Sequence, residues 1–276
     1  MATLQCGNRI FSFEQPAIMG ILNVTPDSFS GDGIYLRPDA AIARARTMVL
    51  EGADIIDVGG ESTRPESLPV SAREELRRVL PTVEALVSEL TVPISIDTTK
   101  PMVAEECLKL GAYMINDVSG LRDKQMCAVV AKYHVPAVIM HIQGTPQTMQ
   151  MGPRYDDVVS EIMSYLQMQA FLAKQYDGVE QIIIDPGIGF GKTLEHNLLL
   201  LRNLEKFRYF GYPLLVGPSR KGFIGAIAGR EADGRLAGTL AAVTACVLNG
   251  ADIIRVHDVA ECRDAMLVAH AIDHAR

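Results

Sequence analysis

The stretch GADIIDV, residues 52–58, returns near the other end of the chain as GADIIRV, residues 250–256, and in a looser form as GAYMINDV, residues 111–118. Glycine often ends a helix in a left-handed conformation, and the β-branched run that follows is apolar on both faces, as in a buried parallel strand. The repeated phrase therefore predicts a helix end followed by a strand, at several places in the chain.

Apolar runs of this kind occur eight times, with helix-like segments between them. The runs are IMGIL from Ile18, DIIDV from Asp54, PISID from Pro93, YMIND from Tyr113, AVIMH from Ala137, QIIID from Gln181, PLLVG from Pro213 and DIIRV from Asp252. The helical patterns between them include residues 38–52, 72–90 and 195–207.

Alternating strands and helices imply a parallel sheet, and eight units in about 250 residues predict an α/β fold, the (β/α)8 TIM barrel with its closed, parallel, eight-stranded sheet. We expect a single domain over residues 1–276. An open doubly wound sheet is the alternative, because closure of a sheet leaves no signal in the sequence.

The composition is that of a compact globular protein with a negative net charge. Lysine and arginine total 26 and aspartate and glutamate 33, which gives −7, whereas a nucleic-acid-binding protein would carry a basic face. The five cysteines are scattered without a CxxC pair, which disfavours a disulfide framework or a zinc site and indicates a reducing cytoplasm. No signal peptide or membrane-spanning run is recognisable, so we expect no membrane partner.

Polar residues stand at the end of nearly every apolar run. They are Asn23, Asp57, Asp97, Asn116, His141, Asp185, Ser219 with Lys221, and Arg255 with His257. Active sites of barrels lie at the carboxyl ends of the strands. Strand residues two apart share a face, so Arg255 and His257 should point the same way while Ile254 and Val256 pack under the helices.

Asp97 and Asp185 both end apolar strands. Each aspartate is expected either to cap the following turn or to bind a ligand from the barrel mouth. Together with Asn116 they would suit the hydrogen-bonding edge of a flat, nitrogen-rich ring, and such a site discriminates strongly because a wrong ring leaves buried polar groups unpaired.

Four side chains that can carry positive charge, those of Arg64, Lys221, Arg255 and His257, follow the predicted strands. In a protein of negative net charge, a local cluster of cations is needed to hold an anion. Ser219, Arg220 and Lys221 stand where the seventh strand turns into a helix, and a helix start beside a cation is an anion site. The alternative is a capping serine followed by solvated bases.

Three other features have competing interpretations. The loop NVTPDSFSGDG, residues 23–33, is either a surface turn or a lid, and Val24 and Phe29 favour the lid. The stretch PGIGFGKT, residues 186–193, is not a P-loop, because that motif requires glycine where Pro186 stands. His141 is ambiguous, and the histidines at 134, 196, 270 and 274 are expected on the surface.

Taken together, the motifs ILNVTPDSFS, DVGGESTRP, SIDT, INDVSG, DPGIGFGKTLEHN, PSRK and IRVHD resemble the bacterial dihydropteroate synthase family, in order and over essentially the whole chain. The resemblance implies a (β/α)8 barrel that works as a homodimer. It also implies an enzyme that joins (7,8-dihydropterin-6-yl)methyl diphosphate to 4-aminobenzoate and releases diphosphate, and that sulfonamides target.

The resemblance assigns roles residue by residue. The pterin set is Asp97, Asn116, Asp185 and Lys221; the Mg²⁺ ligand is Asn23; the diphosphate contacts are Arg64, Arg255 and His257; the aminobenzoate pocket is Thr63, Pro65, Phe190 and Ser219; Met140 and Gly217 are expected beside the substrates; and Asp97, Lys221, Arg255 and His257 are the catalytic candidates. The chain departs from the family pattern at Gly31-Asp32, at Glu66 and at Gly222, where a second serine is frequent.

These residues suit a dissociative substitution. Mg²⁺, arginine and protonated histidine would neutralise the leaving diphosphate, and Asp97 would stabilise the methylene cation that remains. The first two loops would act as lids that exclude water. A pterin-holding barrel without synthase activity is the alternative, and the Arg255–His257 pair and the Asn23 loop argue against it.

Overall fold

The computed structural model describes residues 3–7, 9–25, 38–64 and 67–275. Its centre is a parallel sheet of eight strands: β3 (Ala17–Asn23), β4 (Ile55–Gly59), β5 (Ile94–Asp97), β6 (Met114–Asp117), β7 (Ala137–Met140), β8 (Ile182–Asp185), β9 (Leu215–Val216) and β10 (Ile253–Val256). Their order is β8-β7-β6-β5-β4-β3-β10-β9. A parallel bridge between Ile184 and Leu214 joins the two ends. The sheet is therefore a closed barrel, and the open alternative is wrong.

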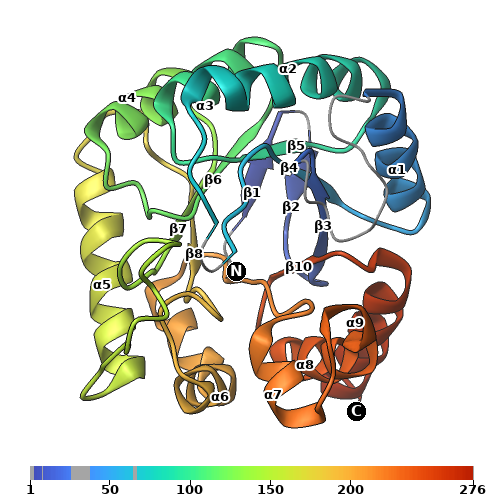
Figure 1. The fold of residues 1–276 in the computed structure, drawn as a ribbon, viewed down its shortest axis with the longest axis vertical. Coiled ribbons are helices and arrows are strands. Elements are labelled where there is room, and N and C mark those ends of the chain that lie inside the picture. The colour runs from blue at the N-terminus through green and yellow to red at the C-terminus, as the bar shows by residue number, and fades with distance from the viewer. Residues whose placement is uncertain (1–2, 8, 26–37, 65–66, 276) are drawn as a thin grey trace.

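Helices surround the barrel (Figure 1). They are α1 (Pro38–Leu50), α2 (Ala72–Glu89), α3 (Pro101–Lys109), α4 (Lys124–Tyr133), α5 (Val158–Ala173), α6 (Leu194–Arg202), α7 (Gly222–Ala228), α8 (Leu236–Leu248) and α9 (Val259–Asp273), with 3-10 turns η1 (Leu204–Phe210) and η2 (Ala232–Gly234). Among the described residues, no helix combines the length and the apolar character that a membrane span requires.

The repeated phrase has the predicted conformation. Gly52, Gly111 and Gly250 follow α1, α3 and α8 with φ of +100°, +105° and +85°, which is backbone that glycine adopts without strain. The strand residues alternate as expected: Ile254 and Val256 belong to the apolar layer between sheet and helices, whereas Arg255 points into the barrel.

A short hairpin that the sequence patterns did not reveal closes one end of the barrel. Strands β1 (Leu4–Cys6) and β2 (Arg9–Phe11) pair antiparallel. Leu4, Cys6 and Phe11 pack against inward side chains near the starts of the barrel strands: Ala17, Met19, Ile55, Met114, Val138, Ile183, Leu215 and Ile253. The amino-terminal end of the barrel is therefore filled, and the carboxyl end holds the site.

Val24 does not belong to a lid. Its side chain is only 1% exposed and packs in the layer between sheet and helices, and its N–H donates to the carbonyl of Gly59, which extends the pairing of β3 with β4. A lone apolar residue in a polar stretch here continues the strand. Phe29 lies outside the described residues.

Candidate functional site

A cavity of about 1010 Å³ opens at the carboxyl ends of the strands. Thirteen of the fourteen predicted site residues line it: Asn23, Thr63, Arg64, Asp97, Asn116, Met140, Asp185, Phe190, Gly217, Ser219, Lys221, Arg255 and His257. The fourteenth, Pro65, lies outside the described residues, as do the departures at 31, 32 and 66. The described residues named from the strand ends and from the family resemblance therefore lie around one cavity.

The floor of the cavity is a buried charge network centred on Arg255. Its Nε donates to Oδ2 of Asp57 at 2.7 Å, and its Nη2 donates to Oδ2 of Asp97 at 2.7 Å. Nδ2 of Asn116 donates to the same oxygen of Asp57 at 2.9 Å. Arg255 is thus the counter-charge of two carboxylates, a role that the sequence analysis did not predict.

Asp57 is the site residue that the sequence analysis missed. It is the middle residue of β4, fully buried beneath the cavity, and it accepts hydrogen bonds from both Arg255 and Asn116. Its partners come from strands distant in the chain. The only available signal was a carboxylate within an apolar run, and that signal did not separate a ligand-binding carboxylate from one that positions its neighbours.

Asp97 and Asp185 differ in their surroundings. Burial raises the pKa of Asp97 to about 7, although the Arg255 cation acts against this shift. Burial also raises the pKa of Asp185 to about 6, opposed by the hydrogen bond from the Gly187 N–H at 2.7 Å. Asp185 therefore caps the following turn and also lines the cavity, and its ligand-binding role stays a prediction.

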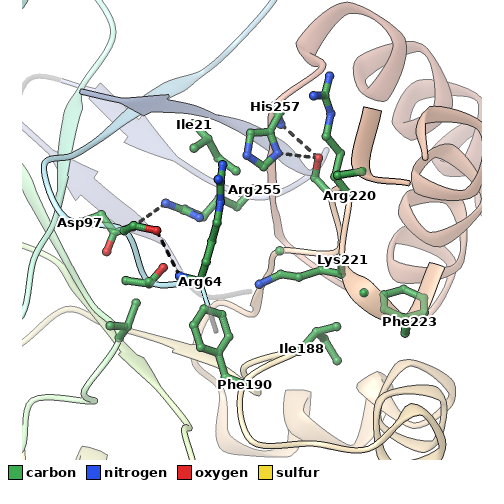
Figure 2. Close-up of a pocket in the computed structure, with 18 of the residues that line it drawn as sticks. Ile21, Arg64, Asp97, Ile188, Phe190, Arg220, Lys221, Phe223, Arg255 and His257 are labelled. Atoms are coloured by element: carbon green, nitrogen blue, oxygen red, sulfur yellow. Dashed lines mark hydrogen bonds and ion pairs between the residues drawn. The ribbon is translucent and has the colours of Figure 1, made fainter. Parts of the chain in front are cut away.

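Lys221 and Phe190 form the side of the cavity (Figure 2). The Lys221 ammonium lies 4.1 Å from the centre of the Phe190 ring, a cation–π contact. Burial and the Arg255 cation lower the pKa of Lys221 to about 8, with Asp185 opposing them. Phe190 also packs with Met140 and Met149 in a small apolar cluster. This wall suits a flat aromatic ligand.

The surroundings of His257 favour its neutral form. Burial, and next the Arg255 cation, lower the pKa of its imidazole to about 3. Its Nδ1 lies 3.0 Å from the hydroxyl oxygen of Ser219, and its backbone N–H donates to the same oxygen. Burial and a neighbouring cation both disfavour the charged form of an imidazole, so protonation of His257 would need a bound anion beside it.

Two further arginines line the cavity near His257. Arg44 of α1 donates from Nη2 to the His257 carbonyl at 3.1 Å. Arg220 pairs with Asp258 through Nε at 2.9 Å and also through Nη2, and its own backbone is left-handed, with φ of 55°. Figure 2 places Arg220 and His257 across the cavity from Asp97. Positive side chains thus gather around one side of the mouth.

Comparisons with known proteins agree with this geometry. The family described as pterin binding enzyme matches residues 19–257. The dihydropteroate synthase of Synechocystis sp. is 47% identical over 273 residues, covering 98% of this chain and 94% of that protein.

Two solved structures share the fold along their whole length. The Yersinia pestis dihydropteroate synthase with a sulfonamide drug complex has a TM-score of 0.96 at 40% identity, covering 99% of this chain and 100% of that one. The Thermus thermophilus dihydropteroate synthase in complex with 4-aminobenzoate has a TM-score of 0.89 at 46% identity, covering 98% and 100%. The chain therefore belongs to the pterin-binding enzymes, in their dihydropteroate synthase branch.

Proposed function

We propose that this protein catalyses the condensation of (7,8-dihydropterin-6-yl)methyl diphosphate with 4-aminobenzoate, giving 7,8-dihydropteroate and diphosphate for folate biosynthesis. The observation that supports this most is that one cavity combines a polar floor with an apolar wall. Buried Asp97, Asn116 and Asp185 line its floor, where a ring with N–H and amidine groups finds acceptors. Phe190 and Met140 form an apolar wall for the second ring.

The chemistry follows from charge. The carbon–oxygen bond to diphosphate breaks as negative charge develops on the leaving group, which Lys221, Arg64 and hydrogen bonds from His257 stabilise. The methylene group left on the pterin carries positive charge, and the Asp97 carboxylate stabilises it. The neutral arylamine then attacks the methylene carbon, forming the carbon–nitrogen bond, and its proton passes to the released diphosphate or to water. Because an arylamine is a weak nucleophile, ionisation precedes attack.

Asn23 fits a Mg²⁺ site in which the protein supplies few of the ligands. Its amide lines the cavity at the end of β3. Among the described residues there is no group of three or more His, Cys, Asp or Glu suited to a metal. Mg²⁺ commonly takes one or two protein oxygens and completes its shell with substrate phosphates and water. When bound, it would supply positive charge to the departing diphosphate.

The direct test measures diphosphate release by the purified protein. Release should require both substrates and Mg²⁺, should stop with a chelator and recover on adding Mg²⁺, and should be inhibited by a sulfonamide competitively with 4-aminobenzoate. Binding of the pterin without any release of diphosphate would instead identify a non-catalytic binding barrel.

The pH profile should report the two buried carboxylates. Since burial raises the pKa of Asp97 to about 7 and that of Asp185 to about 6, both lose their charge as the pH falls. We expect kcat/KM for the pterin diphosphate to decline below about pH 7, well above the range of exposed carboxylates near 4. The substrate diphosphate also titrates here, so Asp185→Asn serves as the control. In Asp185→Asn the decline near pH 7 should remain, and the steeper decline below about pH 6 should disappear. An equally steep decline below about pH 6 in that variant would contradict the contribution of Asp185.

Gly222 leaves room for the serine that is frequent in the family. A Cβ placed there meets no atom within 4 Å, and Gly222 is the first residue of α7. We expect Gly222→Ser to lower KM for 4-aminobenzoate about threefold, because one added hydrogen bond to a carboxylate contributes about 1 kcal/mol or less at a half-exposed site. Steady-state kinetics would check this, with Gly234→Ser as control because a Cβ there makes only ordinary contacts. A higher KM would contradict it.

We also propose that the protein forms a homodimer in the cytoplasm. Helices α8 and α9 lie side by side in Figure 1 and expose Leu248, Val268 and Ile272, which are 42%, 61% and 62% exposed. Such apolar surface is typical of an interface. All five cysteines are buried and free, as in reducing compartments. Light scattering should give twice the mass of one chain.

A further inference from the structure

Lys192 stands near the end of the stretch PGIGFGKT and is buried, with 3% of its surface exposed. Its Nζ donates to the Phe190 carbonyl at 2.9 Å and the His141 carbonyl at 3.3 Å, and lies 3.0 Å from Nδ1 of His141. None of these acceptors is a carboxylate. Burying an ammonium group opposes folding unless its hydrogen bonds are satisfied, so the three contacts indicate a specific task for this side chain.

The glycines of the same stretch allow two loops to touch. A Cβ on Gly187 would lie 2.0 Å from the His141 carbonyl oxygen, and a Cβ on Gly191 would lie 2.6 Å from that of Gln143. Both glycines have positive φ, of +69° and +65°. The loop after β8 therefore lies directly on the backbone that follows β7, and Lys192 joins the two by hydrogen bonds.

The residue held in this way is Phe190. Its carbonyl accepts from Lys192, while its ring faces the cavity, packs with Met140 and Met149, and lies under the Lys221 ammonium. Figure 2 shows the Phe190 ring beside Lys221. The direction of the ring depends on the backbone at 190, and that backbone is fixed from behind by Lys192.

His141 provides the fixed point for this arrangement. The imidazole ring of His141 packs edge-on against Tyr165, with centroids 4.9 Å apart. The backbone N–H of His141 donates to the Asp185 carbonyl at 3.0 Å. Burial and the Lys192 cation lower the pKa of its imidazole to about 3, so the ring is neutral and Nδ1 can accept from Lys192. The sequence did not reveal the role of His141. In the structure it accepts hydrogen bonds from Lys192.

We propose that Lys192 is a positioning residue for the aromatic amine: it holds the Phe190 backbone against the end of β7, so that the Phe190 ring forms the wall of the 4-aminobenzoate subsite. This assignment rests on the proposed function. The role explains the lysine of PGIGFGKT without any bound nucleotide. It concerns the 4-aminobenzoate subsite, whereas Asp97, Asn116 and Asp185 are the proposed pterin contacts on the cavity floor.

The experiment compares Lys192→Met with wild type in the full-length protein, varying each substrate in turn. Methionine keeps the unbranched stem of the side chain, one atom shorter, and removes the donors. We expect KM for 4-aminobenzoate to rise about tenfold, equivalent to about 1.4 kcal/mol, and KM for the pterin diphosphate to change less than about threefold. Lys206→Met, on the exposed face of η1, is the matched control and should resemble wild type.

A double-mutant cycle tests whether Lys192 acts through Phe190. If it does, Lys192→Met should add little to the aminobenzoate KM of Phe190→Ala, because residues that act in series are not additive. Should Lys192→Met fold poorly, Lys192→Gln is the second variant, because it retains an amide donor. We expect it to raise KM for 4-aminobenzoate by a smaller factor, again with little change in KM for the pterin diphosphate.

The possible results separate this inference from the proposed function. Equal losses for both substrates, fully additive effects in the cycle, or an unchanged aminobenzoate KM in an active Lys192→Met would each overturn the positioning role alone. Absence of turnover in wild type would overturn the proposed function and this assignment with it.

Discussion

Replacing Asp97 by asparagine is expected to lower kcat by a factor of about 10² to 10³, with a change of less than about fivefold in KM for the pterin diphosphate. Asparagine has nearly the same shape and keeps one oxygen acceptor, so the ring can still bind. The negative charge disappears, however, and it lies in a site only 6% exposed, where an effective dielectric well below that of water makes a charge strongly felt.

Two further variants show whether this effect is specific. Asp185→Asn should chiefly raise KM for the pterin, because Asp185 is proposed to bind the ring and not the methylene cation. Asp264→Asn, on the exposed side of α9, should leave both constants unchanged. A loss in Asp97→Asn that is shared equally between kcat and pterin affinity would contradict the stabilisation of a cation by Asp97.

Replacing Arg255 by methionine is expected to reduce the free energy of unfolding by about 3 to 5 kcal/mol, since removal of one partner leaves buried charges uncompensated. Here the guanidinium joins Asp57 and Asp97, which are 0% and 6% exposed. Urea denaturation followed by circular dichroism would measure the change.

The loss should also depend on pH. Burial already raises the pKa of Asp97 to about 7, and without Arg255 it rises further. A carboxyl with a raised folded-state pKa weakens the fold once the pH exceeds its unfolded value, and protonation relieves this. The deficit of Arg255→Met should therefore be larger at pH 8 than at pH 5.5. Arg255→Lys should recover part of the stability, and Arg202→Met on α6 serves as control. A deficit equal at both pH values would contradict the role of Arg255 as counter-charge.

Most of the barrel could be predicted because buried parallel strands are apolar on both faces and helix ends carry glycine. All eight predicted strands are present, and the strand ends bring the predicted site residues to one cavity. The hairpin of β1 and β2 was missed because each strand has only three residues, too few for a periodic pattern. Sheet closure required the structure, since it depends on one bridge between distant segments.

The electrostatic state of the site could not be predicted from residue types. The lowered pKa of His257 follows from its burial beside Arg255, and the pairing of Arg255 with Asp57 joins residues 198 positions apart. Likewise, nothing in the sequence placed Lys192 against His141. Each of these contacts joins residues far apart in the sequence, whereas a motif describes only residues that are neighbours along the chain. The assigned ligand roles of the site residues remain predictions for the experiments above.

The β1–β2 hairpin fills the amino-terminal end of the barrel, and the cavity of the described residues lies at the carboxyl ends of the strands. We therefore expect both reactants to enter, and both products to leave, at the carboxyl end. Asp97 and Asn116, the proposed contacts of the pterin ring, are 6% and 3% exposed, so we expect the pterin to bind deeper in the cavity than 4-aminobenzoate. We therefore expect ordered binding in steady-state kinetics, with the pterin diphosphate binding before 4-aminobenzoate.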